Sequence, residues 1–255
     1  MFLIVLSPAK TLDMSPSFVK DYTKSSLSKD TKILLGILKK LSSNDLQELM
    51  GISQALADLN YLRYQQFVWP FTLSNSKQAL LAFKGDVYKG INLDQFTSKD
   101  YSFTQQSVRI LSGLYGCLRP LDLIQPYRLE MKTTLKNPLG KNLYAFWKKQ
   151  LVATLNAEIA ALDKQYIVNL ASDEYFKALD VKSLSVPVLK VAFKENKKGS
   201  YKVVAILAKK ARGKMVNFVI KHKIQALEGL KSFDCDGYTY QEKLSNKKEW
   251  VFVRD

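Results

Sequence analysis

The sequence predicts a single α/β domain in which helices flank a mixed β-sheet, and three observations support this prediction. Short apolar runs typical of buried strands alternate with longer segments whose apolar residues repeat at helical spacing. The 255 residues, 47% of them hydrophobic, are enough for one sizeable core. No repeat, low-complexity tract or clear linker divides residues 1–255.

Taken in order along the chain, apolar runs that end in turn residues predict the strands. These are Phe2–Leu6, Gln78–Phe83, Ser107–Leu111, Ile167–Ala171, Val188–Phe193, Tyr201–Leu207, Lys231–Glu242 and Glu249–Val253. Helical spacing predicts helices over Thr31–Leu41, 43–50, 53–67, Asn142–Leu162 and Ala211–His222. Thr11–Lys29 reads as a surface loop, and Asn196–Gly199 as a hairpin turn.

The charge of the chain is strongly positive. Its 39 Lys and Arg residues against 23 Asp and Glu give a formal net charge of +16. The excess is greatest from Lys182 to Asp255, with 17 Lys and Arg against 7 Asp and Glu. Such a surface favours a polyanionic partner, above all nucleic acid, although a lysine-rich surface that only confers solubility is the alternative.

Three predicted strands end in small clusters of polar and charged residues. Lys10 follows the first strand, Lys84 and Asp86 the second, and Asp173 and Glu174 the strand near residue 170. Ligands of open α/β sheets bind beyond the carboxyl ends of the strands. We therefore expect these clusters to form one positively charged cleft, the alternative being separate polar loops.

The segment Leu111–Met131 contributes two further cations to this expected cleft. Its glycines and prolines specify an irregular path, while Arg119 and Arg128 carry planar guanidinium groups suited to phosphate. Asp122 and Glu130 lie close by in the sequence, so structural Arg119–Asp122 and Arg128–Glu130 salt bridges are the alternative interpretation. The two are compatible, because a paired arginine can still present its outer donors to a ligand. Glu130 then counts among the carboxylates of the cleft.

Two more features suggest contacts with phosphate. Lys209, Lys210, Arg212 and Lys214 lie within six residues where a strand is expected to give way to a helix, and helix N-termini attract phosphate. Gly51 separates two short helical runs, so residues 43–67 fit a helix-hairpin-helix element, whose turn directs backbone N–H groups at the DNA backbone. A solvated basic turn and a plain helical corner are the respective alternatives.

Other functional classes find little support. Two isolated cysteines and one histidine, His222, argue against a zinc site, a disulfide framework and Ser-His-Asp or Cys-His catalysis. Phosphate-binding glycine motifs are missing. We predict neither cofactor nor metal. The short apolar N-terminus is no signal peptide and no run would span a membrane, so a soluble cytoplasmic protein is expected.

Five motifs together resemble the YaaA family of bacterial peroxide stress proteins. They are SPAKTLD from Ser7, AFKGDVY from Ala82, LSGLYGCLRPLDLIQPYRLEM from Leu111, NLASDEYFK from Asn169 and AKKARG from Ala208. The resemblance implies a mixed α/β fold with a positively charged cleft and a helix-hairpin-helix element. It also implies DNA binding with little sequence preference, and survival of hydrogen peroxide with less unincorporated iron and less oxidative DNA damage. No catalytic residue comes with it.

Three functions therefore remain in competition. The first is a DNA-binding stress protein, supported by charge and resemblance. The second is an enzyme acting on nucleic acid or nucleotides through the arginine, lysine and carboxylate side chains of the expected cleft. The third, iron sequestration, has mainly carboxylates to offer as ligands.

Overall fold

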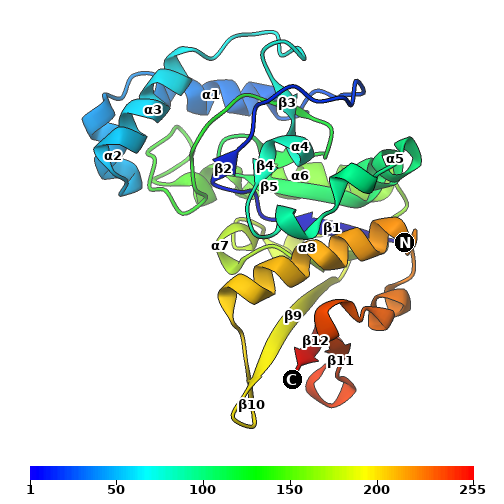
Figure 1. The fold of residues 1–255 in the computed structure, drawn as a ribbon. Coiled ribbons are helices and arrows are strands. Elements are labelled where there is room, and N and C mark those ends of the chain that lie inside the picture. The colour runs from blue at the N-terminus through cyan, green and yellow to red at the C-terminus, as the bar shows by residue number, and fades with distance from the viewer.

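An eight-stranded mixed β-sheet forms the centre of the computed structural model, which describes all 255 residues (Figure 1). Its strand order is β11-β12-β9-β8-β1-β5-β6, and β10 pairs with the free end of β9. The bounds are β1 (Phe2–Leu6), β5 (Val108–Ser112), β6 (Gly116–Leu118), β8 (Tyr166–Asn169), β9 (Val188–Lys197), β10 (Ser200–Lys202), β11 (Thr239–Tyr240) and β12 (Glu249–Arg254). The predicted α/β class, with helices flanking a mixed sheet, is confirmed.

Five strands of this sheet are parallel, and their order creates a crevice. β1 pairs with β5 on one side and with β8 on the other, and β9 and β12 continue outward from β8. The chain thus passes from β1 to β5 and then crosses back to β8. Connections leave β1 and β8 in different directions, which makes the carboxyl ends of these two strands a topological switch point.

Helices pack on this sheet and on a smaller layer at one side of it. In Figure 1, α5 and α8 lie in front of the sheet, α6 lies behind it, and α1, α2 and α3 gather at the top. The helices are α1 (Ser28–Leu38), α2 (Ser43–Met50), α3 (Gln54–Gln65), α4 (Ala79–Ala82), α5 (Ser98–Ser107), α6 (Leu143–Ala161), α7 (Asp173–Phe176) and α8 (Ala205–Lys221). Two-residue strands β2 (Thr11–Leu12) and β4 (Phe83–Lys84) pair with each other, as do β3 (Lys77–Gln78) and β7 (Leu123–Ile124). Sixty-five buried residues form one contiguous hydrophobic cluster.

Helix α8 is held in place by two glycines, Gly213 in the middle of the helix and Gly90 in the segment packed against it. A Cβ on Gly213 would lie 1.7 Å from the Val87 carbonyl oxygen, and one on Gly90 would lie 2.6 Å from the Lys210 carbonyl oxygen. The helix therefore packs backbone to backbone against residues 87–90, as only glycine permits.

The carboxyl end of α8 is held by a buried carboxylate. Asp100, in the first turn of α5, forms a capping box with Thr97 and accepts from Lys221 at 3.2 Å and from Lys223. Burial opposes ionisation of Asp100, but the hydrogen bonds from Lys223, Thr97 and Lys221 outweigh it and hold its pKa well below the usual range. These contacts fix how α8 lies across the sheet.

Most predicted elements are found near their expected positions, including Phe2–Leu6, the strand near Ser107–Leu111, the long helix within Asn142–Leu162 and the turn at Asn196–Gly199. The strand predicted over Gln78–Phe83 is wrong, because Ala79–Ala82 form the buried helical turn α4. Ala and Leu favour helix, and this apolar run contains no β-branched residue that would have favoured a strand.

Two predictions in the last third are also wrong. Tyr201–Leu207 leaves the sheet after Lys202 and enters α8, which begins at Ala205 rather than near Ala211. Its β-branched residues have no strand to pack beside, and Val203 is 58% exposed. Residues Lys231–Glu242 form short 3₁₀ turns and the two-residue β11, because Asp236 and Gly237 adopt left-handed backbone conformations that interrupt a strand.

Candidate functional site

A cleft of about 420 Å³ opens at the carboxyl ends of β1 and β8, where the sheet has its switch point. Its walls come from the loops that follow β1 and β4, the segment around Glu130, the start of α7 and the first half of α8. Seven charged side chains predicted from the sequence line it: Lys10, Lys84, Asp86, Glu130, Glu174, Lys209 and Arg212. The fold thus brings together residues that are up to two hundred positions apart.

Hydrogen bonds between strand ends build the floor of the cleft. The Ser172 backbone N–H donates to the Ser7 hydroxyl oxygen at 2.8 Å, and that hydroxyl donates to the Ser172 hydroxyl at 3.2 Å. The buried Tyr88 hydroxyl donates to the Ser7 carbonyl at 3.0 Å. Three separate segments therefore meet at Ser7, and the cleft has a fixed base.

Close packing at two glycines shapes the walls. A Cβ on Gly85 would lie 3.0 Å from the Cβ of Ala9, so the loop carrying Lys84 and Asp86 lies directly against the loop after β1. A Cβ on Gly113 would lie 2.3 Å from the Leu129 carbonyl oxygen, which brings Glu130 to the sheet edge. Glycine at these positions sets the distances between the charged segments.

Glu130 is the most heavily paired charge in the cleft. Lys10 contacts it at 2.9 Å, Arg128 at 3.1 Å and Lys132 at 3.6 Å. Burial raises the pKa of this carboxyl, but the hydrogen bond and charge of Lys10, followed by the charges of Lys132 and Arg128, hold it below the usual value. Glu130 therefore remains ionised near neutral pH and orients these three cations.

A second carboxylate acts on Lys84 from outside the cleft. Asp13 lies 3.6 Å from the Lys84 ammonium and 3.7 Å from that of Lys77. Side-chain and backbone hydrogen bonds from Ser15, followed by these two charges, lower the pKa of Asp13 to about 2. Sequence analysis did not select Asp13, although it closes the SPAKTLD motif.

Two arginines have buried donors without partners: Arg212, which lines the cleft, and Arg128, which contacts Glu130. The Nε atoms of Arg212 and Arg128 are buried and make no hydrogen bond. Burial lowers the pKa of Arg212, and the charge of Asp173 only partly compensates. A buried donor without a partner costs about 1–3 kcal/mol, so an anion reaching Arg212 would recover hydrogen-bonding energy. No carboxylate lies within salt-bridge distance of Arg212 or Lys209, unlike Lys10 and Lys84.

Several predicted residues lie elsewhere. Arg119 pairs with Asp122 at 3.0 Å and donates to the Lys24 carbonyl, so its inclusion in the cleft is wrong. The expected Arg119–Asp122 and Arg128–Glu130 salt bridges are both present. Arg128 pairs with Glu130 but does not itself line the cleft. Asp173, with its side chain 92% exposed, does not line the cleft and pairs with Lys190 at 3.8 Å.

The basic cluster of α8 is divided among different surroundings. Lys209 and Arg212 line the cleft, Lys210 is exposed, and Lys214 pairs with Asp236. Because α8 begins at Ala205, the cluster lies beyond its first turn, and its placement at the helix N-terminus was wrong. The helix therefore presents side chains here rather than free backbone N–H groups.

Gly51 ends α2 in the left-handed conformation with φ 59°, and Ser53 precedes α3. Residues 43–67 are thus two helices joined by a tight glycine turn. They carry Asp45, Glu48 and Asp58 but only Arg63 as a cation.

The uncharged parts of the cleft were only partly expected. Ser7, Ser172, Tyr88 and Tyr175 line it, and burial raises the pKa of both tyrosines. The two serines belong to the polar clusters that directly follow predicted strands, whereas sequence analysis did not select the two tyrosines. Lys132, which contacts Glu130, was not selected either, because nothing in the sequence around it indicated this contact.

Neither cysteine has an activated thiol. Burial raises the pKa of Cys117 and also that of Cys235, so both thiolates are disfavoured at neutral pH. No three His, Cys, Asp or Glu side chains lie together as a metal-binding group. None of the helices combines the length and apolar character needed to cross a bilayer.

The fold and cleft define an α/β protein whose charged site lies at the switch point of a parallel sheet, lined by cations from distant segments. Residues 2–244 match the family described as peroxide stress protein YaaA, and the chain belongs to that family.

Relatives similar over nearly their whole length include UPF0246 proteins of Acaryochloris marina, Dechloromonas aromatica and Teredinibacter turnerae. They are 51%, 47% and 48% identical to this chain, each over 253 residues and 99% of its length. The matched regions cover 100%, 98% and 99% of those proteins, respectively.

Proposed function

We propose that this protein of the peroxide stress family binds the phosphate backbone of DNA with little regard to sequence, and thereby limits iron-dependent oxidative damage to DNA. The observation that carries the proposal is the convergence of Lys10, Lys84, Lys209 and Arg212 on one cleft, with the Arg212 Nε left without a partner. Phosphate oxygens match both the charge and the unused donor.

Beyond the cleft, a basic surface suited to a longer polyanion extends along the hairpin that leads into α8. β9 and β10 project from the sheet as a ribbon that bears the exposed Lys197, Lys198 and Lys202 (Figure 1). The chain then enters α8, where Lys209 and Lys210 are exposed. A duplex laid against this side would meet cations on both the ribbon and the helix.

The helix pair at residues 43–67 is the second proposed DNA contact. Its support is the tight left-handed turn at Gly51 between two helices, and Ser53 leaves the first N–H groups of α3 without a side-chain cap. Its acidic side chains reduce its electrostatic attraction, so we assign it a smaller share of the affinity than α8.

The test is a salt titration of duplex DNA binding with a matched pair of variants. Lys209→Ala/Lys210→Ala removes two exposed charges from α8. Lys99→Ala/Lys182→Ala removes two exposed, unpaired lysines that do not line the cleft. Each lysine that neutralises a phosphate contributes about one unit to the slope of log affinity against log salt.

The α8 variant should therefore have a slope shallower by about two units and weaker binding on every DNA sequence alike, while the control keeps the wild-type slope. Wild-type binding that does not weaken with salt would contradict the proposal. An equal effect of both double variants would remove α8 from the DNA contact.

The second candidate is an enzyme acting on nucleic acid or a nucleotide. It is favoured by the cleft's position at the switch point, where α/β enzymes bind ligands, and by the carboxylates of Asp86 and Glu174 in its wall. Incubating DNA and nucleotides with the protein and Mg²⁺ tests it. Turnover that Asp86→Asn and Glu174→Gln both abolish would favour the enzyme.

A further inference from the structure

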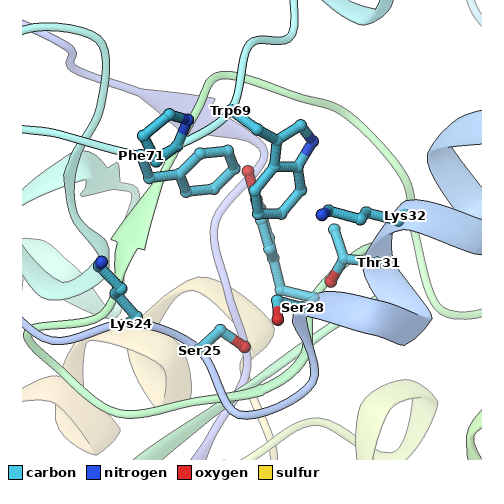
Figure 2. Close-up of a pocket in the computed structure, with 9 residues that line it drawn as sticks. Lys24, Ser25, Ser28, Thr31, Lys32, Trp69 and Phe71 are labelled. Atoms are coloured by element: carbon cyan, nitrogen blue, oxygen red, sulfur yellow. The ribbon is translucent and has the colours of Figure 1, made fainter.

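A second cavity, of about 180 Å³, lies between the start of α1 and the segment 69–71 (Figure 2). One wall is made by residues 24, 25, 28, 31 and 32, the other by Trp69, Pro70 and Phe71, and Tyr115 also lines it. It shares no residue with the charged cleft. Ordinary small-molecule sites measure about 300–1,000 Å³, so this cavity suits one ring system rather than a whole cofactor.

Aromatic rings form a rigid stack along one side of the cavity. Trp69 stacks on Phe71 with centroids 4.3 Å apart and planes at 17°, and Phe71 meets Tyr115 edge-on at 6.3 Å. Tyr115 is fixed in turn, because its hydroxyl donates to the Gln125 carbonyl at 3.1 Å and accepts from the Gln125 N–H at 2.8 Å. The indole of Trp69 is therefore held in place by stacking although it remains exposed.

Trp69 differs from the other two tryptophans of the chain. It is 37% exposed, whereas Trp147 is fully buried and Trp250 is 8% exposed. The hydrophobic core does not include Trp69. A stacked, accessible indole is the surface on which unpaired bases bind in proteins that hold single-stranded nucleic acid.

One lysine lies over the exposed indole, and a second lines the same cavity. The Lys32 ammonium lies 4.6 Å from the Trp69 ring centroid, and Lys24 lines the same cavity (Figure 2). Arg119 reaches this region too, donating to the Lys24 carbonyl at 2.7 Å. A lysine ammonium over an exposed indole raises the equilibrium constant for that contact about three-fold, whereas a base stacked on the indole raises its binding constant about ten-fold. A base would therefore displace Lys32 from the ring. The displaced ammonium would then be free to meet a phosphate.

We infer that this cavity receives an unpaired DNA base, stacked on Trp69, with Lys24 and Lys32 against the neighbouring phosphates. The hydroxyls of Ser25 and Ser28 lie in the same wall and offer hydrogen bonds to the edge of the base. The inference rests on the proposed DNA binding and adds a preference for DNA with unpaired bases over intact duplex.

The experiment compares an intact duplex with the same duplex carrying a short central bubble, using three variants. Trp69→Ala removes the stacking surface, and Trp69→Phe keeps a ring but removes the indole. Tyr166→Ala is the matched control, since Tyr166 is a 39% exposed aromatic that lines neither the cavity nor the cleft.

Trp69→Ala should weaken binding of the bubble by about ten-fold and of the duplex by less than about two-fold, with Tyr166→Ala without effect on either. Tryptophan fluorescence should be quenched by the bubble in the wild type and in Tyr166→Ala. It should not be quenched in Trp69→Phe, because the two remaining tryptophans are buried.

Two outcomes would overturn the inference while leaving the proposed function intact. In one, Trp69→Ala weakens both DNAs equally or neither. In the other, the quenching survives in Trp69→Phe, a readout that stands even if Trp69→Ala fails to fold. Wild-type protein that binds neither DNA would overturn the proposed function together with the inference.

Discussion

Replacing Gly213 by alanine should destabilise the protein, although alanine is the better helix former. Gly213 lies inside α8, where the change to Ala would gain about 1 kcal/mol of helix propensity. The new Cβ, however, would lie 1.7 Å from the Val87 carbonyl oxygen and 3.1 Å from the Gly90 Cα. Both neighbours are backbone atoms, so no side-chain rotation relieves the overlap, and α8 must move away from residues 87–90.

The net effect follows from the two opposing terms. Overpacking costs about 1–3 kcal/mol where side chains can adjust and more where they cannot, so we expect a net loss of about 2 kcal/mol or more. For a chain of this size that lowers Tm by about 4–8 °C. Gly36→Ala is the matched control, because Gly36 lies inside α1 with no atom within 4 Å of a Cβ.

Thermal unfolding followed by circular dichroism measures both variants. Gly36→Ala should raise Tm by about 2–4 °C, from the propensity gain alone. A Gly213→Ala protein at least as stable as the wild type would refute the backbone-to-backbone packing of α8.

Three further predictions concern charge and reactivity. Asp100→Asn should cost about 2 kcal/mol at pH 7, since it removes a helix cap and the partner of two lysines. Folding lowers the pKa of Asp100, so its contribution to the free energy of unfolding is complete above about pH 4 and is lost as the pH falls further. In urea titrations below that pH, the stability of Asp100→Asn should therefore depend less on pH than that of the wild type. Cys117 and Cys235, whose pKa values burial raises, should react with iodoacetamide at pH 7 more slowly than a free cysteine, and rapid labelling of the folded protein would be inconsistent with this. Glu130→Gln should tighten duplex DNA binding about three-fold at low salt by releasing Lys10, and weaker binding in a folded variant would show that the carboxylate is needed to position the cation.

The sequence could predict which segments form the cleft because strand ends carry a local signal. Apolar runs mark the strands, and in a parallel sheet polar residues just after them gather at one edge. That rule placed Lys10 and Glu174 correctly. Lys84 also lines the cleft, but for another reason: the strand expected before it is the helix α4, and β4 reaches the cleft because it pairs with β2, shortly after β1. The rule did not predict that Arg119 would lie apart, because Arg119 follows β6, which runs antiparallel to β5 and so ends at the other edge.

The boundaries within the last third could not be predicted for a different reason. Val203 and Ile206 have the β-branched side chains of a strand, yet they are 58% and 53% exposed where the chain leaves the hairpin for α8. Whether such a segment forms a strand depends on the availability of a partner strand, and here β10 pairs with β9 over only three residues. The start of α8, and with it the depth of Arg212 in the cleft, is thus set by tertiary structure.

Helix α8 links the stability of the fold to the proposed contact with phosphate. Of the four cations that line the cleft, Lys10 and Lys84 are paired with carboxylates, whereas Lys209 and Arg212 are not. The electrostatic attraction left over for a ligand therefore comes chiefly from α8, which carries both unpaired cations on one side. Gly213, the residue directly after Arg212, is also the point at which α8 touches the loop from β4 most closely. A shift of the helix at Gly213 would displace both cations in the cleft wall, so the proposed phosphate binding would depend on the same close backbone packing that holds the helix on the sheet.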